Sequence, residues 1–135
     1  VRLENAMRDG SFGENPVFAA AVEQAKRSGG AVHLLALLTK KSSHGSIDYP
    51  LELLALCRRM GQDEVYLHII FDGRSTPPGS APALLRELEE AMRQKGAGRI
   101  VSGVGRGIAL DRDKNWAKVK KAYDSMTRGT GARYR

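Results

Sequence analysis

Three short apolar runs, separated by longer amphipathic segments, constrain the fold of this chain more than any other feature. The runs are AVHLLALL (31–38), EVYLHIIF (64–71) and RIVSG (99–103), and each is followed by a polar loop that contains glycine. Because a strand–helix–strand connection joins parallel strands, the alternation predicts a mainly parallel sheet with helices on both faces. We therefore expect an α/β protein with a three-layer α/β/α fold.

Capping and stop residues indicate where the helices of this fold begin and end. A short helix is expected over residues 1–8, ahead of an Asp-Gly pair. Asn15 precedes a proline, which favours the first helical position, and a Gly-Gly pair ends that helix. We expect side chains of the same polar kind to cap the three later helices, at Asp48, Ser80 and Asp113.

The apolar runs also predict which residues are buried. The run 31–38 is continuously apolar apart from His33, which is typical of a strand buried on both faces. His33 and His68 lie inside such runs, and we interpret both as core histidines with hydrogen-bond partners. The single cysteine, Cys57, lies in an apolar helical segment, so we expect a small buried residue outside any internal disulfide.

Size and composition favour one globular domain. The chain has 135 residues, enough for a buried core, and 41% of them are hydrophobic. No stretch approaches the roughly 18 apolar residues that span a membrane, and the first ten residues lack the apolar region of a signal peptide. We therefore expect a cytoplasmic protein with no membrane partner.

The charge of the chain favours an anionic partner. Its net charge is +7, which suits either nucleic acid or a phosphorylated small molecule. No run of five or more Lys or Arg occurs, and aromatic residues make up only 6% of the chain, so base stacking has little support. We expect no nucleic-acid partner, although a basic nucleic-acid-binding domain is the alternative that charge alone leaves open.

The loops that follow the three strands are the expected location of a binding site, because ligands of parallel sheets bind beyond the carboxyl ends of the strands. These loops span residues 39–47, 72–79 and 104–112. The cationic candidates in them are His44, Arg74, Arg106 and Arg112. Since a guanidinium group binds phosphate and carboxylate in a bidentate manner, the loops predict one compact anion site.

Other kinds of site lack support in the sequence. Histidines, cysteines and acids do not occur at the spacings of a metal site, so we expect no metal and no cofactor in this domain. The segment SGVGRG departs from the glycine loops that bind dinucleotides or nucleoside triphosphates. Nor does any serine lie in a nucleophile elbow.

Several motifs occur in an order that resembles a known enzyme family. They are DGSFGENP (9–16), AVHLLALL, FDGRSTPP (71–78), GRGIALDRDKNW (105–116) and KAYD (121–124). Together they resemble the transferase domain of the cofactor-independent (2,3-bisphosphoglycerate-independent) phosphoglycerate mutases. The resemblance covers nearly the whole chain.

The resemblance implies a function and a domain organisation. In this family the transferase domain holds the substrate, while a phosphoserine and two manganese ions belong to a separate phosphatase-like domain, and the two together interconvert 3- and 2-phosphoglycerate. Residues 1–135 would be the transferase domain, with 1–8 and 128–135 as linker regions. The expected partners are phosphoglycerate and the covalently linked second domain, the protein is expected to be a monomer, and this domain alone is expected to be inactive.

The resemblance also implies roles for individual residues. His44 matches a substrate-contacting histidine of the family, and Arg74, Arg106 and Arg112 match its substrate-binding arginines. Ser75 stands where the family has an aspartate implicated in proton transfer, and a serine hydroxyl cannot do that work by itself.

Two other departures accompany Ser75. The family's loop SDGGVHSH reads TKKSSHGS here, with Ser46 in place of its second histidine, and RYYAM reads RGIAL. The alternative function is therefore a diverged relative that binds phosphate but is non-catalytic or has altered specificity.

Overall fold

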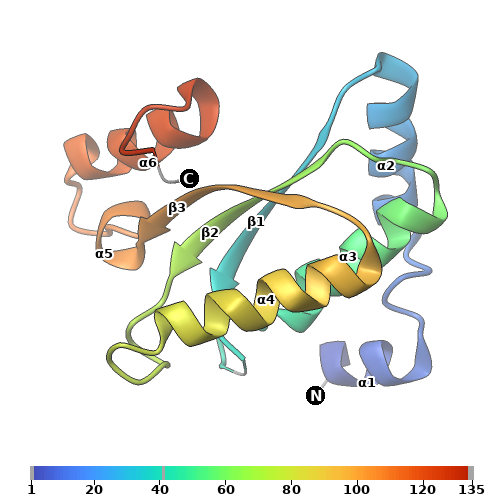
Figure 1. Ribbon diagram of the computed structural model, residues 1–135, viewed down its shortest axis with the longest axis horizontal. Coiled ribbons are helices and arrows are strands. Elements are labelled where there is room, and N and C mark those ends of the chain that lie inside the picture. The colour runs from blue at the N-terminus through green and yellow to red at the C-terminus, as the bar shows by residue number, and fades with distance from the viewer. Residues whose placement is uncertain (1, 41, 134–135) are drawn as a thin grey trace.

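A computed structural model describes residues 2–40 and 42–133 of the chain (Figure 1). The elements, in order, are α1 (Arg2–Asp9), α2 (Pro16–Ser28), β1 (Val32–Leu38), α3 (Asp48–Arg59), β2 (Val65–Phe71), α4 (Ala81–Lys95), β3 (Arg99–Gly105), α5 (Arg106–Ala109) and α6 (Trp116–Arg128). The three strands form one parallel sheet in the order β1-β2-β3. The predicted α/β fold with a parallel sheet is therefore confirmed.

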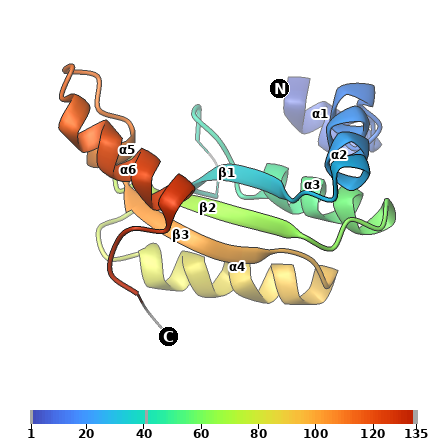
Figure 2. The ribbon, with the colours of Figure 1, turned by 90° about the horizontal axis from the view of Figure 1, so that it is seen from above.

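The layers place helices on both sides of the sheet. Figure 1 shows α3 and α4 beneath the strands and α6 above the end of β3, and Figure 2 shows the same strands from above. Val32 is paired with Val65 and Tyr66 with Arg99, so all three strands run from the same end of the sheet to the other. The register between β2 and β3 shifts once, between Leu67 and His68.

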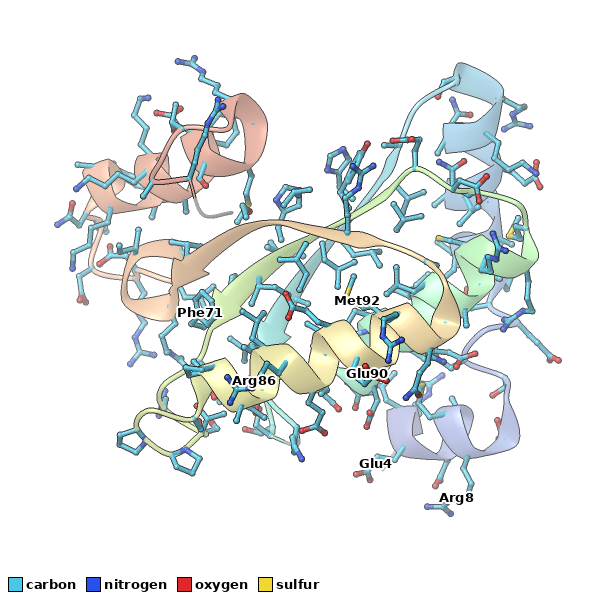
Figure 3. The ribbon with its side chains drawn as sticks, viewed as in Figure 1. Glu4, Arg8, Phe71, Arg86, Glu90 and Met92 are labelled. Carbon is cyan, nitrogen blue, oxygen red and sulfur yellow. The ribbon has the colours of Figure 1, made fainter. Side chains whose placement is uncertain are left out.

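The core lies between the sheet and the helices beneath it. Leu54 of α3, Leu67 of β2 and Leu88 of α4 are each 0% exposed. Met92 points from α4 toward the sheet in Figure 3 and belongs to the same cluster. Cys57 is also buried there, as predicted, and is a free thiol.

The helices begin close to the predicted positions, but not every predicted capping residue acts as a cap. The Asn15 side chain accepts the Val17 amide, which confirms the cap of α2. Asp48 is instead the first residue of α3, where its amide donates to the Ser46 hydroxyl. Ser80 occupies the N-cap position of α4 without capping, because its hydroxyl donates to the Pro77 carbonyl.

Asp113 also differs from its predicted role. The cap of α6 is Asn115, whose side chain accepts the Lys118 amide. Asp113 itself is exposed, and its backbone amide donates to the Asp111 carboxylate. The last helix therefore begins two residues later than an Asp113 cap would place it.

The upper face of the sheet is only partly covered, which contradicts the expectation that β1 is buried on both faces. Leu35 of β1 is 60% exposed and Val101 of β3 is 48% exposed. Only Ala122 of α6 is buried among the described residues, while Trp116 and Tyr123 are largely exposed. The continuous apolar run therefore overstated how much of β1 is covered.

The two histidines of the strands lie on this upper face. The buried His68 shares a hydrogen bond with Ser102 Oγ (Nδ1···Oγ 2.7 Å) and one with His33 (Nε2···Nδ1 2.9 Å). Burial, followed by the charge of His33, lowers the pKa of His68. The prediction of a buried, hydrogen-bonded His68 is confirmed, whereas His33 is exposed and its prediction as a core residue is wrong.

Across the part of the chain that the structure describes, each helix is too short or too polar to cross a membrane.

We expect the one-sided core to appear in the stability of two matched variants. Leu54→Ala should lower the free energy of unfolding by about 2–5 kcal/mol, because it leaves a cavity in the packed layer. Leu35→Ala makes the same chemical change on the exposed face and should change the free energy of unfolding by no more than about 0.5 kcal/mol. Urea denaturation followed by circular dichroism measures both, and equal losses would contradict the assignment of the core.

Candidate functional site

Cationic side chains from two loops and two helices meet at the carboxyl ends of β2 and β3. Arg74, Arg106, Arg112 and Lys118 line one hollow of roughly 350 Å³. Figure 3 shows Phe71 at the end of β2, where the loop that bears Arg74 begins. The parallel register causes the convergence, because it brings the ends of adjacent strands to the same edge of the molecule.

The loop after β2 is a turn held by its own hydrogen bonds. The Gly73 amide donates to Thr76 Oγ1 (3.1 Å), and the Ser75 amide donates to Asp72 Oδ2 (2.9 Å). Gly73 has a φ of 62°, a left-handed conformation that favours glycine. Pro77 and Pro78 follow, so Arg74 projects from a stiff segment and is itself exposed.

Arg106 is held at the end of β3 by a buried acid. Its Nη1 donates to Asp72 Oδ1, and the Asp72 side chain is 0% exposed. Arg106 is the first residue of the short helix α5, so the expectation that it lies in an unstructured loop over 104–112 is wrong. The strand β3 continues to Gly105, two residues beyond the predicted end.

The ionisation of Asp72 reflects these contacts. Burial is the largest single influence and raises the pKa of the Asp72 carboxyl, but the amide of Ser75, the guanidinium of Arg106 and the amide of Arg74 together outweigh it. The net pKa of Asp72 is therefore lowered from its ordinary value of 3.8. Asp72 is a carboxylate at neutral pH.

A second acid shapes the loop that bears Arg112. Asp111 Oδ2 accepts the amides of Asp113 (3.2 Å) and Asn115 (2.8 Å), and the Asp111 side chain is 4% exposed. Lys118 Nζ lies 3.8 Å from Asp111 Oδ1. Among the residues described, Arg74 and Arg112 form no salt bridge, so both guanidinium groups are available to an anion.

Lys118 is a site residue that the sequence reasoning missed. Lys118 was not among the candidates, because it lies in the predicted last helix and not in a loop that follows a strand. Its position in the first turn of α6, one helical turn beyond the Arg112 loop, is the signal that could have identified it.

His44 and Ser75 lie outside the lining of this hollow. His44 Nδ1 is 3.0 Å from Ser43 Oγ, and the His44 amide donates to Ser42 Oγ, within the loop that follows β1. Ser75 is exposed in the loop after β2. The structure thus brings the three predicted arginines together, and leaves these two candidates on the neighbouring loop surfaces.

A larger hollow of roughly 950 Å³ lies between α1 and the loop after β1. Its basic lining residues include Arg2, Arg8 and Lys40, and Lys40 is paired with Glu87 at 2.8 Å. The arginines of the strand ends do not line it. The candidate site is therefore the smaller hollow, where the three predicted arginines converge at the carboxyl ends of the strands.

The described residues offer little to a metal ion. Within residues 2–40 and 42–133, the side chains of His, Cys, Asp and Glu form no group of three or more that could hold one.

Comparison with known proteins identifies the family. Residues 3–135 match the family described as the BPG-independent PGAM N-terminus. The chain belongs to this family. The predicted resemblance to cofactor-independent phosphoglycerate mutases is confirmed.

Individual relatives agree with this assignment. The chain is 41% identical over 130 residues to the 2,3-bisphosphoglycerate-independent phosphoglycerate mutase of Moorella thermoacetica, covering 96% of this chain and 25% of the relative. It is 42% identical over 130 residues to that of Shigella flexneri, with the same coverage. The chain thus spans about a quarter of the length of the curated relatives it matches.

A solved structure confirms the fold. The phosphoglycerate mutase of Leishmania mexicana, determined at low cobalt concentration, superposes with a TM-score of 0.86 at 22% sequence identity. The match covers 97% of this chain and 25% of that one. The α/β arrangement described above is thus the fold of a corresponding part of a phosphoglycerate mutase.

We expect the Asp72 ion pair to make stability depend on acidity. Since the folded pKa of Asp72 is lowered, its contribution is complete above the ordinary value of 3.8 and is lost as the pH falls through the folded value. The difference in unfolding free energy between the native chain and Asp72→Asn should therefore be constant at neutral pH and shrink in acid. Urea titrations at several pH values measure this difference.

Asp63→Asn is the matched control for this prediction. Asp63 is an exposed acid paired with Arg58 at 3.4 Å, so its removal should change stability by less than about 1 kcal/mol at any pH. If the difference in unfolding free energy between the native chain and Asp72→Asn stays constant into strong acid, the Asp72–Arg106 ion pair does not make stability depend on pH.

Proposed function

We propose that this chain is the substrate-binding part of a phosphoglycerate mutase that interconverts 3- and 2-phosphoglycerate. The observation that supports this most is the convergence of Arg74, Arg106 and Arg112 at one hollow on the carboxyl ends of the strands. Family membership supplies the enzyme class, and the arginines supply the charge that a phosphorylated carboxylic acid requires.

The cations of the hollow suit a ligand with two anionic groups. Phosphoglycerate has a phosphate and a carboxylate on a three-carbon skeleton, and both accept bidentate hydrogen bonds from guanidinium. Arg74 and Arg112 are unpaired among the described residues, while Arg106 is oriented by Asp72. Binding at several points fixes the orientation of the substrate, which is most of what a protein contributes to phosphoryl transfer.

The rest of the reaction belongs to a second domain in this proposal. Residues 1–135 form the transferase domain, with 1–8 and 128–135 as linkers to a phosphatase-like domain that provides the serine nucleophile and two Mn²⁺ ions. Most of the first linker is the helix α1, and residues 1, 134 and 135 lie outside the described part of the chain. We further propose a monomeric, cytoplasmic enzyme that does not bind nucleic acid, and a domain that is inactive by itself.

Ser75 favours a second candidate function. An exposed serine stands on the loop where the family has an acid, so a protein that binds phosphoglycerate without efficient proton transfer is the alternative. Substrate binding is common to both candidates, and turnover separates them.

We expect substrate binding to depend on the unpaired arginines. Arg74→Gln and Arg112→Gln should each weaken the binding of 3-phosphoglycerate by about tenfold or more, because each removes charge-assisted hydrogen bonds. Isothermal titration calorimetry measures the affinity. Arg27→Gln is the matched control, since Arg27 lies at the end of α2 and contacts Gln24. Equal affinities in all four proteins would exclude the site.

Turnover distinguishes the two candidate functions. Mutase activity should be measured in the complete polypeptide that contains this chain, with Ser75 and with Ser75→Asp. If the chain serves an active mutase, the natural serine form turns over and aspartate is not required. A form that is inactive until Ser75→Asp restores activity would support the non-catalytic alternative instead.

A further inference from the structure

Asp72 is a buried carboxylate that connects both arginine-bearing segments of the site. It follows β2 directly, accepts the Ser75 amide with Oδ2 at 2.9 Å, and accepts Arg106 Nη1 with Oδ1. Its side chain is 0% exposed. One acid thus binds the turn that presents Arg74 and the first residue of α5.

A buried acid beside the hollow is electrostatically unfavourable for a site that binds anions. A negative charge beside the hollow reduces the positive potential that attracts an anion, and burial of a carboxylate is itself unfavourable. Charge alone would therefore favour a neutral residue at position 72. A role in orientation resolves this conflict, because a guanidinium group bound at one N–H keeps its other donors in a fixed plane.

We propose that Asp72 is a positioning residue of the anion site, which fixes the Arg106 guanidinium and the Arg74–Ser75 turn in one arrangement before the substrate arrives. This inference rests on the proposed function, in which the hollow binds a phosphorylated anion. A site that is already ordered loses less entropy on binding, so the orientation of Arg106 adds more affinity than the charge of Asp72 removes.

The same contacts exclude Asp72 as a replacement for the acid that Ser75 lacks. A proton-transfer group needs an oxygen that reaches the substrate and a pKa near the working pH. Both oxygens of Asp72 have protein donors, its side chain is inaccessible, and its pKa is lowered from 3.8. Asp72 acts through Arg106 and not on the substrate.

A double-mutant cycle tests the proposal. The affinities of the native chain, Asp72→Asn, Arg106→Gln and the double variant are measured by calorimetry, with 3-phosphoglycerate and with inorganic phosphate as probes. Asp72→Asn should weaken binding by about tenfold, although it makes the chain more positive. In the Arg106→Gln background the same change should have less than a twofold effect, because the group that it orients is gone.

Asp63→Asn is the matched control, because Asp63 is an exposed acid that is paired with Arg58 and lies outside the lining of the hollow. Its removal should leave the affinity unchanged or raise it slightly. If Asp72→Asn also leaves the affinity unchanged or raises it, the positioning role is overturned. The positioning role is also overturned if Asp72→Asn weakens binding by the same factor in the native chain and in Arg106→Gln. An acid with a purely structural role would act independently of Arg106.

Arg106→Lys keeps the test decisive if Asp72→Asn does not fold. Lysine retains the positive charge but lacks the planar guanidinium group. If orientation matters, binding should be about tenfold weaker, and if only charge matters, affinity should not change. The two probes separate this inference from the proposed function. If inorganic phosphate binds and 3-phosphoglycerate does not bind more tightly, the proposed function fails while the cycle still tests Asp72. If neither probe binds the native chain, both are overturned.

Discussion

The burial of one face of a three-strand parallel sheet against α3 and α4 holds this structure together. Leu54, Leu67 and Leu88 have no exposed surface, and they come from a helix, the central strand and the next helix. Because the strands are parallel, this packing also sends the loops after β2 and β3 to the same edge. The position of the arginines is therefore a consequence of the core, since no contact between the arginines is needed to bring them together.

Much of this arrangement could be predicted from residue patterns, and the failures have physical causes. The three apolar runs located the strands, and Asn15 was correctly predicted as a cap because it lies directly before proline. The side chains of Asp48 and Ser80 have other partners, the Ser46 hydroxyl and the Pro77 carbonyl, and Asn115 takes the cap position predicted for Asp113. A local pattern identifies a polar residue near a helix start and cannot determine which of several partners it binds.

The candidate site shows the same division between pattern and tertiary structure. The position of the loops after parallel strands predicted one site of His44, Arg74, Arg106 and Arg112, and the structure brings only the three arginines together. Lys118 was missed because helix periodicity does not show which turn of α6 faces another loop. The opposite error concerned β1, where a continuous apolar run predicted burial on both faces although Leu35 is exposed. Apolar composition shows that a segment favours burial. Whether a face of the sheet is buried depends on how far distant elements such as α6 extend over it.

The strand pairing has a consequence for how the site is assembled. Val32 is paired with Val65 and Tyr66 with Arg99, so each pairing joins residues thirty-three positions apart along the chain. Neither pairing is a hairpin, and both require the closure of a long loop before any ladder hydrogen bond forms, which slows folding. The Asp72–Arg106 contact spans the second of these closures. Affinity for an anion at the proposed site therefore requires that this crossover has closed, and during refolding such affinity would report its closure.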